Sequence, residues 1–405
     1  MPIVVVHGVN TRNTEPGYKA RLALITSLLG THLAGATVNG KAVTDTKPDF
    51  PYWGDFAASF AWDMASLPTG QIDSLGGGVD ADLRPLVAVI HDALGDLQSA
   101  QAQPLLTLAR KSLPQSVAVL SDALIQSASD PDADRVAAFV ASAQAYAEAN
   151  PNPAWVATVT TDPQFLNRLV TEITGPAPSG LVQPLGAGGS IVNALSSAAA
   201  KLKNAVTSAA NAALDRTGDF ASTKFLAWER RPLNGILGRF FGDVFVYLDT
   251  RGDRANPGQI LQVIMNAIRQ AAARKPGEPL IVIAHSLGGV ICFDLLSFYC
   301  PEVAVDLFVT VGSQVSQFEE IKRFKTSDPA IPSARRPRAA APGNISHWVN
   351  VFDEVDIFAY ACDKVFDRVI DFRYDTRTYT IKAHGAYLEQ DRFYSRLRAR
   401  IDQLP

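Results

Sequence analysis

The stretch Ile281-Val-Ile-Ala-His-Ser-Leu-Gly-Gly-Val290 decides the fold, because a compact β-branched run turns sharply at Ser286 and an apolar run follows at once. The first run is typical of a buried parallel strand, and the run from Val290 to Phe298 is typical of a helix. A serine at such a turn projects its hydroxyl above the sheet when the residues two before and two after it are small. Here these are Ala284 and Gly288, so the stretch predicts that Ser286 is a nucleophile.

Strands and helices alternate on both sides of this turn. Apolar runs predict strands at 3–6, 280–284, 307–311 and 348–352, and helices at 22–29 (with Gly30 as a stop), 260–268 and 393–401. Residues 51–55 predict a further strand and its turn. The run 240–248 fits a strand or a buried helix equally well. The alternation predicts an α/β fold with a mostly parallel sheet and helices on both faces.

Residues 56–235 differ in character, because Ala, Ser, Gln and Asp dominate and the apolar spacing is helical. The pattern predicts several helices, among them 83–97, 136–143 and 190–214, separated by proline-containing breaks. We therefore expect one catalytic domain built from residues 1–55 and 236–405, and a helical cap or lid insertion at 56–235 above the nucleophile. Docking on a membrane surface is the alternative role for the 190–214 helix.

Composition excludes several classes of protein. The 405 residues are 47% hydrophobic and 19% charged, which is enough apolar material for a large core and excludes disorder along the whole chain. The net charge of −3 argues against sequence-independent nucleic-acid binding. Three scattered cysteines are too few for a disulfide framework or a Cys-rich zinc site. With no signal peptide or apolar run of membrane-spanning length, we expect a cytoplasmic protein, with secretion by a signal-independent route as the alternative.

A serine nucleophile needs a general base, and the base needs a carboxylate that fixes its tautomer. In a strand-turn-helix arrangement of this kind the chain order is serine, acid, histidine. Of the six histidines only His347 and His384 follow the turn. His347 opens a predicted strand, whereas His384 lies in a predicted loop before the last helix, so His384 is the expected base.

The acid is expected at the end of the 348–352 strand, where two aspartates follow. Asp356 stands beyond the strand, in a loop that can turn toward His384, and is the preferred candidate. Asp353 is the alternative acid. Whichever of the two is not catalytic is expected to cap a turn.

The oxyanion of a tetrahedral intermediate needs two hydrogen-bond donors. The backbone N–H of Leu287, directly after the nucleophile, is one. The second is expected from the loop after the first strand, where His7-Gly8 is followed by Val9, with Asn10 next in line. Asn10 and His285, the neighbours of these groups, are expected to contact the substrate.

These motifs together resemble the α/β-hydrolase superfamily, and in particular its lipase-like serine esterases, a group that includes GPI inositol-deacylase-type proteins and some bacterial lipase effectors. The resemblance rests on His7-Gly8, Ala284-His-Ser-Leu-Gly288, Gly312-Ser313, Trp348-Val-Asn350 leading to Asp356, and His384-Gly-Ala-Tyr387. It covers roughly residues 1–55 and 236–405. Where that group typically has Pro-Val after the acidic stretch, this chain has Ile357-Phe358.

The resemblance implies ester hydrolysis through an acyl-enzyme, without a metal or an organic cofactor. We expect a lipase, a phospholipase or a carboxylesterase. A thioesterase or amidase with the same triad, or a non-catalytic scaffold that binds a protein partner, is the alternative. The six cations between Lys322 and Arg338, opposed only by Asp328, form a basic rim that would attract an anionic ester. Peripheral contact with a membrane surface is compatible with such a substrate, and the oligomeric state is left open.

Overall fold

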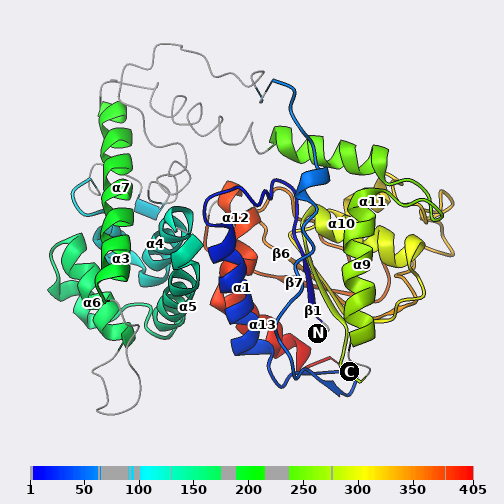
Figure 1. The fold of residues 1–405 in the computed structure, drawn as a ribbon, viewed down its shortest axis with the longest axis horizontal. Coiled ribbons are helices and arrows are strands. Elements are labelled where there is room, and N and C mark those ends of the chain that lie inside the picture. Colours follow the sequence, from blue (N-terminus) through cyan, green and yellow to red (C-terminus); the bar gives the residue numbers. More distant parts are fainter. Residues whose placement is uncertain are drawn as a thin grey trace.

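In the computed structural model five parallel strands form one sheet in the order β1-β4-β5-β6-β7 (Figure 1). The structure describes residues 3–62, 64, 90, 93, 94, 101–128, 130–174, 188–214, 237–274, 277–378 and 380–404. The strands are β1 (Ile3–Val6), β4 (Ile281–His285), β5 (Val305–Val311), β6 (Ile345–Phe352) and β7 (Val369–Arg373). A short hairpin of β2 (Thr37–Val38) and β3 (Lys41–Ala42) stands apart. The predicted α/β class with a mostly parallel sheet is confirmed.

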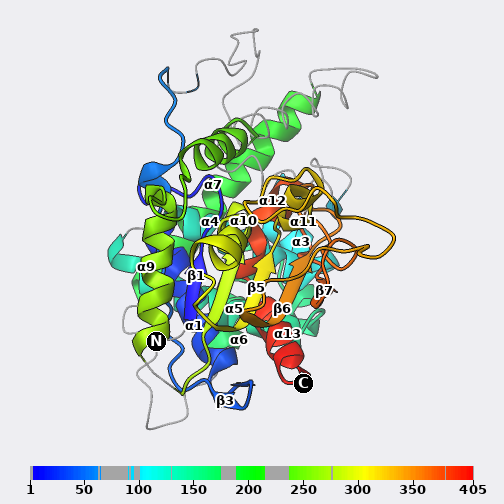
Figure 2. The same ribbon diagram turned by 90° about the vertical axis from the view of Figure 1, so that its right-hand side faces the viewer.

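Both faces of the sheet are buried, as its apolar strands require. Alternate residues of β4 enter two different cores: Ile281 and Ile283 one, Val282 and Ala284 the other. The first core contains α1 (Tyr18–Leu33) and α13 (Asp391–Ile401). The second contains α9 (Gln259–Arg274), α10 (Leu287–Asp294) and the helix at 237–250, and Figure 2 looks at the sheet from this side.

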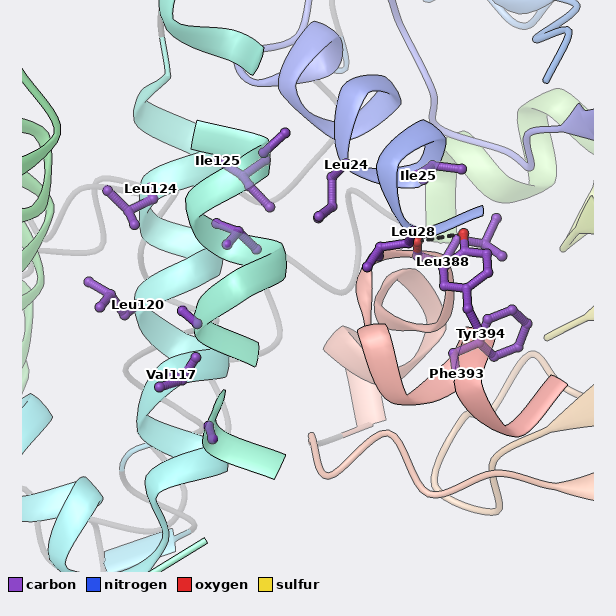
Figure 3. Packing of buried hydrophobic residues seen from close by; sticks show 14 of the residues in the cluster. Leu24, Ile25, Leu28, Val117, Leu120, Leu124, Ile125, Leu388, Phe393 and Tyr394 are labelled. Carbon is purple, nitrogen blue, oxygen red and sulfur yellow. Dashed lines mark hydrogen bonds between the residues drawn. The ribbon is translucent and has the colours of Figure 1, made fainter. Parts of the chain in front are cut away.

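A bundle of helices from the inserted segment extends the first core. Its members are α3 (Pro104–Lys111), α4 (Leu113–Ser127), α5 (Ala133–Ala149), α6 (Asp162–Thr174) and α7 (Gly188–Leu214), with short 3₁₀ turns η3 (Asp130–Asp132) and η4 (Ala154–Thr158) between them. Helix α5 packs along α1 and also touches α13. Figure 3 shows apolar side chains of α1, α4 and the C-terminal region gathered in this core.

The position of this bundle differs from the expected cap. Helices α3–α6 lie beside α1, on the side away from the sheet (Figure 1), so the described helices form a lateral layer. In α7 the apolar stripe of Leu195, Leu202 and Val206 is buried within the bundle, mainly against α4 and α6. That stripe is therefore not available for the membrane-surface role considered for 190–214. The division at residues 55 and 235 stays a prediction.

Most predicted elements of residues 1–55 and 236–405 are confirmed, with three corrections. The helix α1 runs through Gly30 and ends at Leu33. Residues 51–55 form no strand: Pro51 has no N–H to donate, the N–H of Trp53 donates to His7, and the turn η1 (Gly54–Phe56) follows. The ambiguous run 240–248 is helical. Strand β7 was not predicted, and most of the helix expected at 83–97 lies outside the described residues.

Candidate active site

Ser286 occupies the sharp turn between β4 and α10 predicted from the sequence. Its backbone has φ 53° and ψ −129°, a conformation that costs free energy for a residue with a side chain. The turn is held by three hydrogen bonds: Ser286 N to the carbonyl of Val311 at 2.9 Å, Gly289 N to the carbonyl of Ser286 at 2.9 Å, and Ser313 Oγ to the same carbonyl at 2.8 Å. Strand β5 and the loop that follows it therefore hold Ser286 in its strained backbone conformation.

Two glycines allow the backbone to approach this turn closely. A Cβ on Gly288 would lie 2.6 Å from the carbonyl oxygen of His7, and one on Gly8 would lie 2.5 Å from Ser286 Cβ. Both distances are shorter than real Cβ atoms show. The loop after β1 consequently lies directly against Ser286, where the sequence predicts an oxyanion donor.

His384 reaches Ser286 from a different part of the chain. The distance between His384 Nε2 and Ser286 Oγ is 2.8 Å. His384 lies in the short helix α12 (Thr380–Ala386), so the prediction that it lies in a loop is wrong. The residue itself is the expected one. Ser286 is fully buried and His384 is 8% exposed, which keeps bulk water from competing for their hydrogen bond.

Asp356 is the carboxylate that faces the histidine. His384 Nδ1 lies 3.1 Å from Asp356 Oδ1 and 3.0 Å from Oδ2. Because an ionised carboxylate only accepts, Nδ1 carries the proton and Nε2 is free to accept the serine hydroxyl proton. Asp356 also accepts from Phe358 N at 2.9 Å and from the Tyr387 hydroxyl at 2.9 Å.

Asp353, the alternative acid, has a different set of partners. Its Oδ2 accepts from the N–H and the hydroxyl of Thr376, each at 2.7 Å, and its Oδ1 accepts from Val355 N at 3.1 Å. These bonds cap the turn after β6 and tie it to the segment after β7. The geometry therefore favours Asp356 as the partner of His384, and Asp353 as the turn-capping residue.

The hydrogen bonds that each candidate N–H already makes show which of them could face an oxyanion. The N–H of Leu287 is in the first turn of α10, where helical N–H groups have no partner within the helix. The N–H of Asn10 donates to Asp243 Oδ2 at 3.0 Å and is thereby engaged elsewhere. Of the two loop candidates, this leaves the buried Val9 to supply the second donor.

Two further histidines surround the site and are held neutral. Burial, and then the nearby His384, lowers the pKa of His285 to about 3. Burial lowers the pKa of His7 to about 4. His285 Nε2 donates to the carbonyl of His384 at 2.5 Å, and His7 Nδ1 donates to the carbonyl of Gly8 at 2.9 Å. The two imidazoles thus hold the backbone at His384 and at Gly8, in the loop after β1.

The expected substrate contacts of Asn10 and His285 stay predictions, because both side chains already have partners within the chain. Asn10 Oδ1 accepts from Arg239 at 2.9 Å, and its backbone has φ 61°. His285 lies with its ring 4.9 Å from the ring of His384. His347, the rejected base, contacts Asn39 on the exposed surface.

The basic segment after α11 (Val315–Glu320) does not follow the catalytic edge. Lys322 pairs with Glu319, and Arg336 pairs with Asp328 at 2.9 Å. Arg336 lines a pocket of about 670 Å³ that also includes Pro301 and Pro342–Asn344, the residues just before β5 and β6. Because these are the amino ends of parallel strands, the segment runs from the catalytic edge toward the opposite one. The predicted basic rim therefore does not extend to Arg336.

No protein-family model, curated protein or solved structure matches the chain. Any assignment of function consequently depends on the geometry of the site. Among the described helices, none has both the length and the apolar character that crossing a bilayer requires.

Sequence reasoning missed two residues that organise the site. Tyr387 belongs to the motif His384-Gly-Ala-Tyr387, from which no role for its side chain is predicted. Its hydroxyl donates to Asp356 and accepts from Asp353 N at 2.8 Å, so it links the two aspartates. Asp243 was not considered at all. In a helix at 237–250, Asp243 lies on the same buried face as Phe240, Val244 and Tyr247, and an acidic residue on such a face indicates a special role. This pattern can be recognised only once the segment is known to be a helix.

Proposed function

We propose that the protein is a serine hydrolase of the α/β-hydrolase type that cleaves carboxylic esters through an acyl-enzyme. The observation that carries this proposal is the continuous chain of hydrogen bonds from Ser286 through His384 to Asp356. The strand order supports it as well, because the nucleophile, the acid and the base follow β4, β6 and β7 at one edge of the sheet.

The chemistry follows from the two ends of the imidazole. Ser286 Oγ attacks the ester carbonyl carbon while His384 Nε2 takes the hydroxyl proton, and Asp356 stabilises the imidazolium that forms. The carbonyl oxygen becomes an oxyanion facing the N–H groups of Leu287 and Val9. His384 then protonates the departing alcohol. Water, deprotonated by the same imidazole, releases the acid and restores Ser286.

A lipid ester is the substrate class that the surroundings favour. Beside the site lies a group of exposed aromatic side chains, here called the aromatic surface: Phe56, Phe60, Trp62, Phe241 and Phe245, which are 38%, 36%, 82%, 50% and 60% exposed. Exposed apolar patches of this kind mark interaction sites with proteins, membranes or ligands. Aromatic side chains also suit the boundary between water and acyl chains.

The aromatic surface is linked to His384 through buried rings. Phe241 and the buried Phe240 have their ring centres 5.5 Å apart. The ring of Phe240 is 4.8 Å from that of Phe358, which in turn is 4.8 Å from the ring of His384. An acyl chain bound on this surface would therefore contact the outer end of a series of packed rings that leads to His384.

A fluorophosphonate probe tests the proposed function directly, because it forms a covalent adduct only with an activated serine. We expect one adduct per chain, located at Ser286 by peptide mass spectrometry, and hydrolysis of short p-nitrophenyl esters by the same preparation. Folded protein that neither reacts with the probe nor hydrolyses esters would instead be the non-catalytic scaffold.

The lipid preference predicts a selective loss in the variant Phe241→Ser/Phe245→Ser. Burying one phenylalanine is worth about 1.5–3 kcal/mol, so removing two should lower turnover of vesicle-bound esters by roughly tenfold or more. Turnover of a soluble short-chain ester should stay unchanged. Activity on phosphatidylcholine and phosphatidylglycerol vesicles, together with vesicle co-sedimentation, measures the effect.

Ile370→Ser is the matched control for this experiment. Ile370 is also exposed, at 43%, but lies on the edge strand β7. It should leave both activities at the wild-type level. An equal loss on soluble and vesicle substrates in the double variant would contradict the lipid preference.

A further inference from the structure

Asp243 has no surface in contact with solvent, although it carries a carboxylate and takes no part in the proposed hydrogen-bond chain. It lies on the helix at 237–250 and faces residues 8–12, here called the oxyanion loop. Its Oδ2 accepts from Asn10 N at 3.0 Å, and its Oδ1 accepts from Arg12 Nη2 at 3.0 Å and from Ala58 N at 2.9 Å. A buried carboxylate is tolerated only with partners of this kind. The carboxylate of Asp243 thereby connects the helix at 237–250, the oxyanion loop and the segment at Ala58.

These bonds determine which amide of the oxyanion loop can face a substrate. Asn10 adopts the left-handed conformation, with φ 61°, which reverses the direction of the chain directly after Val9. With its N–H donated to Asp243, Asn10 is turned away from the nucleophile. Arg239, one helical turn before Asp243, donates a hydrogen bond from Nη1 to the side-chain Oδ1 of Asn10 at 2.9 Å. The helix thus binds the loop through hydrogen bonds to both the backbone and the side chain of Asn10.

The same helix also reaches the other half of the site. Phe240 packs against Phe358, the residue whose backbone N–H donates to Asp356 and whose ring packs on His384. Arg239, Phe240 and Asp243 therefore place one short helix against both the oxyanion loop and the residues around the base. This helix is the first described element after the inserted segment.

We propose that Asp243 is a positioning residue that holds the oxyanion loop in its catalytic conformation. The inference rests on the proposed serine hydrolase function. Asp243 touches neither the substrate nor the reacting atoms, and acts through the N–H of Val9.

The variant Asp243→Asn tests this role while keeping the shape of the side chain. Its amide N–H₂ group would face donors rather than accept from them, so the loop should lose its fixed conformation. Removal of one oxyanion donor costs about 10²- to 10³-fold in kcat in a serine protease, and partial misplacement should cost about 10- to 100-fold here. We expect KM to stay within about twofold, because the oxyanion forms only after the substrate is bound. The rate of fluorophosphonate labelling should fall in parallel with kcat.

Asp306→Asn is the matched control, because Asp306 is also a buried carboxylate that binds a cation and a backbone N–H. Its partners are Lys41 at 2.9 Å and Leu280 N at 2.8 Å, at the amino edge of the sheet. It should lower thermal stability without changing kcat. Equal losses of kcat in both variants would assign Asp243 a structural role only and overturn the inference.

A second variant keeps the inference testable if Asp243→Asn does not fold. Arg239→Met removes the hydrogen bond to Asn10 from a side chain that is 42% exposed, and it should lower kcat several-fold at unchanged KM. Unchanged kcat in a folded Asp243→Asn or Arg239→Met protein would overturn the inference while the wild type remains an active hydrolase. An inactive wild type would overturn the proposed function itself, and this inference with it.

Discussion

Ser286→Ala should lower kcat for ester hydrolysis by about 10⁵- to 10⁶-fold, because the covalent route is lost together with the nucleophile. Its Oγ donates only to His384, so removing it leaves no buried backbone group without a partner. The turn itself is held by backbone atoms of Val311 and Gly289 and by Ser313, and should persist. We therefore expect a thermal midpoint close to that of the wild type. Steady-state hydrolysis of p-nitrophenyl butyrate and intact-mass detection of the fluorophosphonate adduct measure both consequences.

The control for this prediction is Ser116→Ala, which also removes a buried serine hydroxyl, one that donates to Leu105 O in the bundle. It should keep full activity and labelling. Ser286→Ala/His384→Ala should be no slower than Ser286→Ala, because the two residues act as one unit. Residual activity above about 1% in the single variant would mean that another group performs the attack.

The catalytic turn could be predicted from the sequence because its signal is local. A β-branched run, a serine between small residues and an apolar helix follow one another within 18 residues, and each preference favours the same structure. His384 was found by elimination and chain order, but its helix was not. A seven-residue helix carries too little periodicity to be recognised.

Other features depend on contacts between distant residues and have no local signal. The expected strand at 51–55 failed because Trp53 donates to His7 rather than to a neighbouring strand. Strand β7 at the sheet edge begins with two apolar residues and alternates apolar and charged residues only over 370–373, which is too short a pattern to recognise. Asp243 and Asn10 are 233 positions apart, so their hydrogen bond follows from the tertiary fold alone.

The choice between Asp353 and Asp356 illustrates the same limit. Both are buried aspartates in one loop, three residues apart, and the sequence favours Asp356 only because it stands further beyond the strand. The partners that separate them, His384 for one and Thr376 for the other, follow β7 in the sequence. The same substitution at each of the two aspartates therefore forms a matched comparison.

Asp356→Asn should lower kcat by about 10⁴-fold, the loss known for the same change in a serine protease triad. The asparagine amide can donate to His384 Nδ1, which stabilises the tautomer with its proton on Nε2. That nitrogen then has no lone pair for the hydroxyl proton of Ser286. Because the carboxamide has nearly the same shape, KM and the fold should change little. Single-turnover kinetics with a p-nitrophenyl ester measures the loss at the acylation step.

Asp353→Asn should leave kcat within about fivefold and act mainly on stability. Its amide oxygen can still accept both hydrogen bonds from Thr376, but its NH₂ group would then face the N–H of Val355, which loses its acceptor. A loss of roughly 1–3 kcal/mol in the free energy of unfolding is therefore expected. Urea denaturation of the two variants beside the wild type separates this effect from a catalytic one. If Asp353→Asn were instead the inactive variant and Asp356→Asn the active one, the triad would have to be reassigned to Asp353, with His384 turned toward it in the working enzyme.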